Sequence, residues 1–325
     1  MHDTKGLILL PRLRVHNANA VSGPLSWGFP SPTAFTGFTH ALERRLRETF
    51  DIHLGGVGIV CHRFDPQVHR PNRRRHQTFA LTRNPLIAGW KKYEDKPAAL
   101  VEEGRAHLEV SLLIESLTEL DEEQIESLET HLPGLVGSMR LGGGSIRPAF
   151  EENPRYKPAW KDWPEYSDGQ DEVFRKLRRR LLPGFALVQR EDLLAEHLTG
   201  MREQAPNTDA LDALLDLNRL NFEPGEVDPN ELEKNIWEIR KRPGWLVPLP
   251  VGYAALSPLY GPGEVSHARD QRYSFRFVES LYTLGQWLSP HRLTRLEDLL
   301  WRHHADLENG IYRTVNQYTP IEQNL

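Results

Sequence analysis

The residues of this chain that could do chemistry are glycines and cations rather than a nucleophile with its base. Gly142, Gly143 and Gly144 precede Ser145, and a glycine-rich turn lets backbone N–H groups approach a phosphate closely. The run lacks the Lys-Ser or Lys-Thr ending of a nucleotide-binding loop. A tight turn that enters a strand is the alternative interpretation.

Charge is strongly segregated along the chain. No Asp or Glu occurs from 66 to 93, and the stretch 106–139 has acids but no Lys or Arg. A second basic block covers 175–180. Since Arg makes charge-assisted contacts with phosphates, this pattern predicts a polyanion on one face and a protein on another. A solvated charged surface is the alternative for each block. The cations of the first block are Arg70, Arg73, Arg74, Arg75, Arg83, Lys91 and Lys92, with His69 and His76.

Catalytic and metal sites are poorly supported. A metal-independent ribonuclease needs a positioned general base, and His16, His40 and His62 are candidates by location alone; a structural or phosphate-contacting role is the better interpretation of each. Cys61 lies in an apolar run typical of core packing. His303 and its neighbour at 304 would point about 100° apart on a helix. We therefore expect no cofactor and no metal.

Composition bounds the class of protein. The 325 residues suggest about two domains. The net charge of −5 argues against a general coat for DNA but leaves room for a local basic groove. One cysteine excludes an internal disulfide framework. We expect a cytoplasmic protein without a membrane span, because the apolar runs are far shorter than about 20 residues.

The first 150 residues predict an α+β arrangement in the order β-α-β-β-α-β. This is the ferredoxin-like order, which also builds the RNA-recognition motif. Ser31 and Pro32 are typical of a helix start. The predicted elements are a strand at 7–15, a helix from Ser31 to Phe50, strands at 54–64 and 106–116, a helix at 122–132, and a strand at 145–150 after the glycines.

The remainder predicts a more helical region. Trp245–Leu256 is interrupted by Pro248 and Pro250, which favours an edge or irregular strand. A short strand is expected at 185–190. The predicted helices cover 171–182, 192–202, 209–220, 230–242, 275–288 and 292–304.

Several blocks of sequence, in this order, carry a resemblance to a known family. They are LPRLRVHNANAVSGPLSWGFPSPTAFTG (10–37), GVGIVCHRF (56–64), VEEGRAHLEVSLL (101–113), RLLPGFALV (180–188), KRPGWLVPLPVGYAALSPLY (241–260), WLSPHR (287–292) and DLLWRHHAD (298–306). The chain resembles the RAMP-superfamily tail subunit of the type I-F (Csy) CRISPR surveillance complex, which holds the 5′ handle of the crRNA.

The resemblance implies a fold and a function. The fold is a ferredoxin-like RAMP domain over 1–150 with an inserted β-hairpin thumb near 65–100, followed by a mixed, largely helical region over 151–325. The function is that of a non-catalytic subunit. It would bind the crRNA 5′ handle, pair with the large tail subunit, abut the terminal backbone subunit, and meet target DNA only within the assembled complex. A crRNA-processing endoribonuclease on the same fold is the alternative, and a purely protein-bridging subunit is a third hypothesis.

The expected RNA-binding residues come from four regions. Asn17 and Asn19 could read base edges, and Trp27 could stack on a base or plug the core. The basic residues would contact phosphates, and the glycine turn would supply backbone N–H groups. The full set is Arg12, Arg14, Asn17, Asn19, Trp27, Arg63, Arg73, Arg74, Arg75, His76, Gly142, Gly143, Gly144 and Arg147.

Overall fold

A computed structural model describes residues 3–70, 77–79, 81–83, 100–147, 149, 152–224 and 237–320. The described chain is a mixed α/β protein with one large antiparallel sheet of 11 strands and five α-helices. Hydrogen-bonded neighbours in this sheet follow the order β11-β15-β14-β17-β16-β2-β7-β1-β9-β8, and β10 pairs with β1. None of the described helices is long and apolar enough to cross a membrane.

The N-terminal elements follow the predicted order. They are β1 (Gly6–Asn19), α1 (Pro32–Phe50), β2 (Leu54–Pro66), β7 (Arg105–Ser116), α2 (Glu122–Gly137), β8 (Arg140–Leu141) and β9 (Gly144–Arg147). Four of the strands lie side by side as β2-β7-β1-β9, and each neighbouring pair is antiparallel. The strands at 7–15, 54–64 and 106–116 and both helices are therefore confirmed. The strand after the glycines is shorter than expected and ends at Arg147.

Local signals explain where the two helices begin. The Ser31 hydroxyl accepts a hydrogen bond from the backbone N–H of Thr33 at 3.1 Å, and Pro32 is the first helical residue of α1. Asp121 and Gln124 form a reciprocal capping box at the start of α2. Both helices thus begin at residues that satisfy otherwise unpaired N–H groups.

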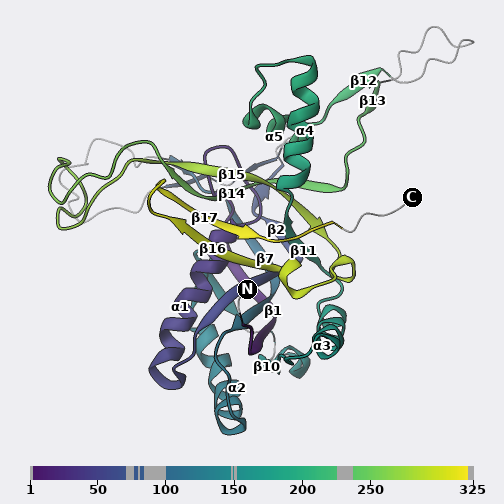
Figure 1. Cartoon of the computed structure of the whole chain (residues 1–325), viewed down its shortest axis with the longest axis vertical. Helices are drawn as coiled ribbons and strands as arrows, with labels where there is room; N and C mark the ends of the chain where they lie inside the picture. Colours follow the sequence, from purple (N-terminus) through teal and green to yellow (C-terminus); the bar gives the residue numbers. More distant parts are fainter. Residues whose placement is uncertain are drawn as a thin grey trace, which may run out of the picture.

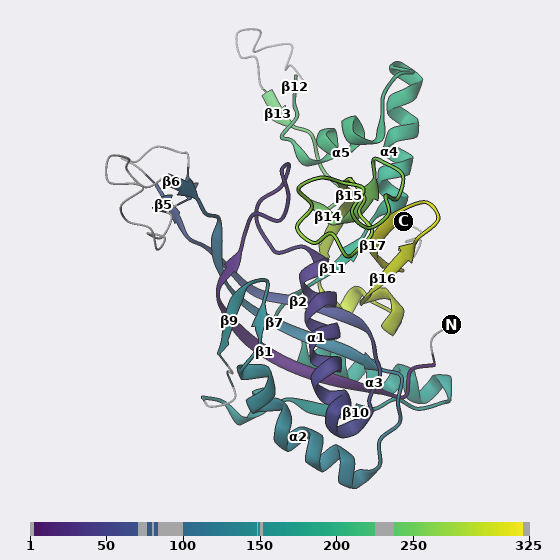
Figure 2. The same ribbon diagram turned by 90° about the vertical axis from the view of Figure 1, so that its left-hand side faces the viewer.

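The central strands are buried on both faces. On β1, Ile8 and Leu10 belong to the core that contains residues of α1 and α2, whereas Leu7 and Leu9 belong to a second core with residues of α3 (Ser167–Arg180). Figure 2 shows α1 lying across the strands. Burial on both sides accounts for the continuous apolar run of this strand.

The C-terminal part contains more strand than the sequence predicted. Its elements are β10 (Ala159–Asp162), α3, β11 (Phe185–Gln189), α4 (Glu191–Gln204), α5 (Ala210–Asn218), β12 (Phe222–Pro224), β13 (Trp237–Ile239), β14 (Trp245–Ala255), β15 (Val278–Leu288), β16 (Leu300–Asp306) and β17 (Ile311–Asn316). The strand at 185–190 and the helices at 171–182, 192–202 and 209–220 are confirmed.

Two predicted helices are wrong. Residues 278–288 of the first segment form β15, and the second segment, 292–304, contains 3₁₀ turns followed by the start of β16. Of the helix predicted at 230–242, residues 230–236 lie outside the described chain, and 237–239 form β13. The expectation of a more helical C-terminal part is therefore wrong for these segments.

The C-terminal strands close on themselves through β2. Strand β11 pairs with β15 and also with β2, at Cys61 and Val60, while β16 pairs with β2 at Gly58 and Val57. The pairings β2-β16-β17-β14-β15-β11 therefore return to β2 (Figure 1). One strand is shared between the N-terminal strands and this closed circuit.

Candidate nucleic-acid interface

The glycine run forms a tight turn at one edge of the sheet. Gly142 and Gly143 connect β8 to β9 and have φ angles of 54° and 78°, which suit the two central residues of a hairpin turn. The Asn19 N–H donates to the Gly142 carbonyl at 2.8 Å. A Cβ at Gly144 would lie 2.7 Å from the carbonyl oxygen of His16, so only glycine fits. The turn thus packs directly against the end of β1.

Two irregularities shape that end of β1. Its register against β7 shifts once around Arg12 and again around Asn17, and both residues have left-handed φ angles, 52° and 58°. Such bulges bend a strand and re-aim its side chains. The apolar pattern of the sequence gives no signal for the bulge at Arg12.

Cationic side chains gather beside the glycine turn. Arg14 on β1 lies opposite Arg147 on β9, and Arg147 is exposed. The Arg14 guanidinium pairs with Glu152 at 2.6 Å but keeps 40% of its side chain exposed. The pKa of His16 is lowered by burial and by the nearby positive charges of His107, Arg147 and Arg14. This edge therefore presents positive charge next to backbone N–H groups, as an anion site requires.

Arg12 stands apart from this cluster. Its guanidinium pairs with Glu109 at 2.8 Å, donates to the Pro183 carbonyl at 3.2 Å and lies 5.9 Å from the ring centre of Tyr156. Only 14% of the side chain is exposed. These contacts fasten β1 to β7 and to the loop before β11, and an RNA contact by Arg12 stays a prediction.

The two asparagines make hydrogen bonds within the chain. The side-chain oxygen of Asn17 accepts a hydrogen bond from the side-chain amide of Gln67 at 2.5 Å. The side chain of Asn19 accepts from the Val21 N–H and donates to the Val21 carbonyl. Both side chains are exposed. Asn19 thus holds the start of the loop 20–30, whereas Asn17 joins β1 to the residue that follows β2. Their reading of bases stays a prediction.

Arg63 lies near the end of β2, next to the segment that connects β2 to β7. It is 70% exposed and pairs with Asp65 at 3.1 Å. The described part of the connecting segment forms two short antiparallel pairs, one of β3 (Val68–His69) with β4 (Thr78–Phe79) and one of β5 (Leu81–Arg83) with β6 (Leu100–Glu102). Figure 2 shows β5 and β6 projecting from the sheet. The predicted contacts that lie outside the described residues are Arg73, Arg74, Arg75 and His76.

Trp27 lies on the loop 20–30 at the edge of a large cavity. Its side chain is 61% exposed and meets Phe79 edge to face, with 5.3 Å between ring centres. The cavity has a volume of about 560 Å³. Six of the side chains that line it are aromatic, namely Trp27, Phe29, Phe64, Phe185, Trp245 and Trp287.

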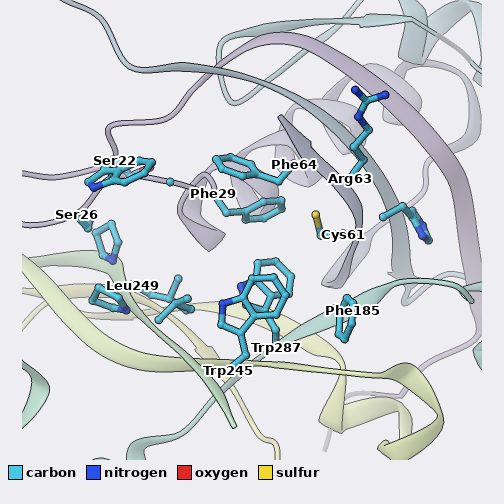
Figure 3. Close-up of a pocket in the computed structure, with 16 residues that line it drawn as sticks. Ser22, Ser26, Phe29, Cys61, Arg63, Phe64, Phe185, Trp245, Leu249 and Trp287 are labelled. Carbon is cyan, nitrogen blue, oxygen red and sulfur yellow. The ribbon is translucent and has the colours of Figure 1, made fainter. Parts of the chain in front are cut away.

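The aromatic rings come from opposite walls of this cavity. Phe29 and Phe64 lie on one side, and Trp245 and Trp287 on the other (Figure 3). Phe29 contacts Trp287 edge to face at 4.9 Å, and Phe185 contacts Trp245 in the same way at 5.7 Å. Nothing in the sequence links Phe185, Trp245 and Trp287 to Trp27, because they lie on strands far along the chain from it.

The candidate catalytic groups have different surroundings. The two ring nitrogens of His62 lie 2.6 Å from the Pro183 carbonyl and 2.7 Å from the Ser111 hydroxyl. Burial raises the pKa of the Cys61 thiol to about 12, so it stays protonated at neutral pH. His40 is exposed on α1. Within the described ranges, no three His, Cys, Asp or Glu residues come together as metal ligands do.

The structure therefore gathers some of the predicted residues and separates others. One edge of the sheet brings together Arg14, Arg147 and the glycine turn, with Asn17 and Asn19 beside them. The Arg12 guanidinium is instead paired with Glu109 and bonded to Pro183. Trp27 belongs to the aromatic cavity, and Arg63 lies on the edge of that cavity (Figure 3).

Comparison with known proteins identifies close relatives of this sequence. Residues 8–314 match the family described as CRISPR-associated protein (Cas_Csy2). The chain is 52% identical over 319 residues to "CRISPR-associated protein Csy2" of Pseudomonas aeruginosa (strain UCBPP-PA14). The alignment covers 96% of this chain and 95% of that relative.

Proposed function

This chain belongs to the Cas_Csy2 family of CRISPR-associated proteins, and from that premise we propose that it binds the 5′ handle of the crRNA in a type I-F surveillance complex. It is a subunit of a Csy complex, and we infer that it pairs with the large tail subunit and abuts the terminal backbone subunit. The observation that carries the proposal is the 52% identity over nearly the whole chain.

We also propose that the N-terminal strands form a ferredoxin-like RAMP domain. The neighbour order β2-β7-β1-β9, with α1 and α2 at the expected places in the chain, supports this assignment. The short pairs β3–β4 and β5–β6 between β2 and β7 support an inserted thumb. The division of the chain near residue 150 stays a prediction.

Binding of the handle would combine charge with backbone contacts. The Arg14–Arg147 edge supplies cations for phosphates, and the open peptide groups of the Gly142–Gly143 turn can approach a phosphate closely. Target sequence would be read by base pairing of the guide, as in other RNA-guided systems. The subunit would therefore anchor the 5′ end of the guide.

We propose that the chain does this without cleaving RNA. The hydrogen-bonded ring nitrogens of His62 and the protonated thiol of Cys61 support this inference. The alternative, a crRNA-processing endoribonuclease, requires a free base near a 2′-hydroxyl.

The test uses this chain co-expressed with the large subunit of its own complex. Labelled guide RNAs with an intact or a scrambled handle are titrated across a salt series and then examined for cleavage. We expect tight, salt-sensitive binding of the intact handle and no cleavage. Equal affinity for both RNAs would assign handle specificity to another subunit, and RNA cut at the handle boundary would contradict the non-catalytic role.

A further inference from the structure

The aromatic cavity is connected to the glycine turn through a single loop. The loop begins at Asn19, whose N–H donates to the Gly142 carbonyl, and it ends at Pro30, which lies 3.5 Å from the Cβ position of Gly142. Between these two points, Ser26, Trp27 and Phe29 line the cavity. The glycine turn and the cavity are therefore both contacted by this one loop.

Large aromatic rings are exposed around the cavity. The Trp245 side chain is 59% exposed, that of Trp27 61% and that of Phe185 46%. A cluster of exposed rings on one concave surface marks a binding site rather than a core. The exposed indole of Trp245 at this cavity suits a flat ligand, because stacking needs a broad apolar face.

The few polar groups of the cavity also fit a nucleotide. The Ser26 hydroxyl oxygen is buried, and it has no hydrogen-bond partner within the described chain. A buried hydroxyl without a partner is unfavourable, so a ligand atom that bonds it would remove the penalty. None of the residues that line the cavity is acidic, and Arg63 lies on its edge with its guanidinium pointing away from the rings (Figure 3).

We propose that this cavity receives one unstacked nucleobase of the single-stranded crRNA handle. Trp245 provides the stacking surface, Ser26 bonds the edge of the base, and Arg63 meets the adjoining phosphate. This assignment rests on the proposed function and deepens it. An apolar side chain of a partner protein is the competing occupant, but it would leave Ser26 without a hydrogen bond.

The experiment measures binding of guide RNAs that carry one abasic nucleotide at each handle position in turn. The proteins are the wild-type chain and its Trp245→Ala variant, each co-expressed with the large subunit. In the wild type, one abasic position should lower affinity about tenfold or more, since that is typical of a lost base–aromatic stack. Trp245→Ala should bind intact RNA with a similarly lower affinity. Removal of the base at that one position should not weaken the binding of this variant further.

Two further variants make the result specific. Trp237→Ala removes an equally exposed tryptophan (62%) on β13 and should bind every RNA like the wild type. Ser26→Ala should bind intact RNA several-fold more weakly than the wild type and should bind the RNA that lacks that one base like the wild type, without lowering the stability of the free chain.

Each outcome decides the question. If Trp245→Ala binds intact RNA like the wild type while a scrambled handle is still rejected, the cavity holds no base and only this inference fails. If the variant loses the large subunit instead of RNA affinity, the occupant is a protein and the inference is also overturned. If wild-type protein does not distinguish intact from scrambled handles, the proposed function itself fails.

Discussion

The guanidinium of Arg302 on β16 encloses the carboxylate of Glu115 on β7, with Nη2 2.9 Å from both carboxylate oxygens and Nε 3.1 Å from one. Glu115 is fully buried and also accepts hydrogen bonds from the Gly56 N–H at 2.9 Å and the Thr4 hydroxyl at 2.5 Å. This pair joins the N-terminal strands to the closed circuit of C-terminal strands.

Arg302→Met should destabilise the chain by about 3 kcal/mol, because it leaves a buried carboxylate without its cation. Urea unfolding measures the change. Arg272→Met is the matched control, since Arg272 is 80% exposed and its loss should cost less than about 0.5 kcal/mol. Similar losses in the two variants would contradict the structural role of the buried pair.

Stability should fall in acid through Glu115. Burial disfavours its charged form, but the hydrogen bonds from Arg302, Gly56 and Thr4 outweigh burial and hold the pKa of Glu115 below its ordinary value. Because the pKa of Glu115 is lower in the folded chain than in the unfolded chain, its charge stabilises the fold. This stabilisation is complete above the unfolded-state pKa of about 4.3 and is lost as the pH falls through the folded-state pKa.

Urea midpoints measured from pH 7 down to about pH 3 test this titration. Glu115→Gln should be less stable than wild type at neutral pH, and the difference should shrink below about pH 4.3. A difference that stays constant with pH would show that the charge of Glu115 is not the cause.

Loss of both Arg14 and Arg147 should weaken handle binding and its dependence on salt. Each phosphate contact on a single strand contributes about 0.7 to the slope of log affinity against log salt, so the Arg14→Ala/Arg147→Ala double variant should lower the slope by about 1.4. Filter binding over a salt series measures it. Arg272→Ala should leave the slope unchanged, and an unchanged slope in the double variant would remove this edge from the RNA path.

Gly144→Ala should disturb the glycine turn. Its Cβ would lie within 2.7 Å of the His16 carbonyl oxygen and 2.8 Å of the Ala18 nitrogen, so β9 must move away from β1. We expect a loss of about 2 kcal/mol in unfolding free energy and weaker binding of handle RNA.

The matched control for this variant is Gly134→Ala. Gly134 lies in α2 with open space around its Cβ position. Alanine there should be neutral or stabilising by up to about 1 kcal/mol. Equal effects of the two substitutions would refute the packing argument for Gly144.

The N-terminal elements were predictable because each carries a local signal. Ser31 and Pro32 mark a helix start, and the apolar runs of β1, β2 and β7 lie in sheet interiors. The wrong helices have a physical reason as well. Six consecutive residues of β15, from Thr283 to Leu288, are buried, so the strand shows no alternation that would distinguish it from a helix.

The segment after β15 was misread for a related reason. Leu293, Leu296 and Leu299 are spaced as on a helix, yet they are buried from 3₁₀ turns and connecting chain that pack against α3. Spacing predicted which side chains are buried but not the backbone that carries them. Pro248 and Pro250, which suggested an edge strand, lie in β14 where β15 pairs on one side and β17 reaches only 252–254 on the other.

The candidate site was predictable only in part. The glycine turn and the cations Arg14 and Arg147 could be predicted from their residue types. The pairing of Arg12 within the chain could not, because it depends on a bulge at Arg12 and on Glu109, 97 residues away. The aromatic cavity combines the loop 20–30 with β2, β11, β14 and β15. Its assembly depends on tertiary pairing, which no local pattern contains.

Strand β2 has a consequence for synthesis of the chain on the ribosome. Its outer edge is completed by Phe185 of β11 and by Trp301 of β16, which pairs with Val57. At about 5–20 residues per second, the roughly 240 intervening residues take on the order of 10–50 s to emerge. Until then the nascent chain carries an unpaired edge strand of high β propensity, so its vulnerability to aggregation is greatest during translation and ends when the last strands are released.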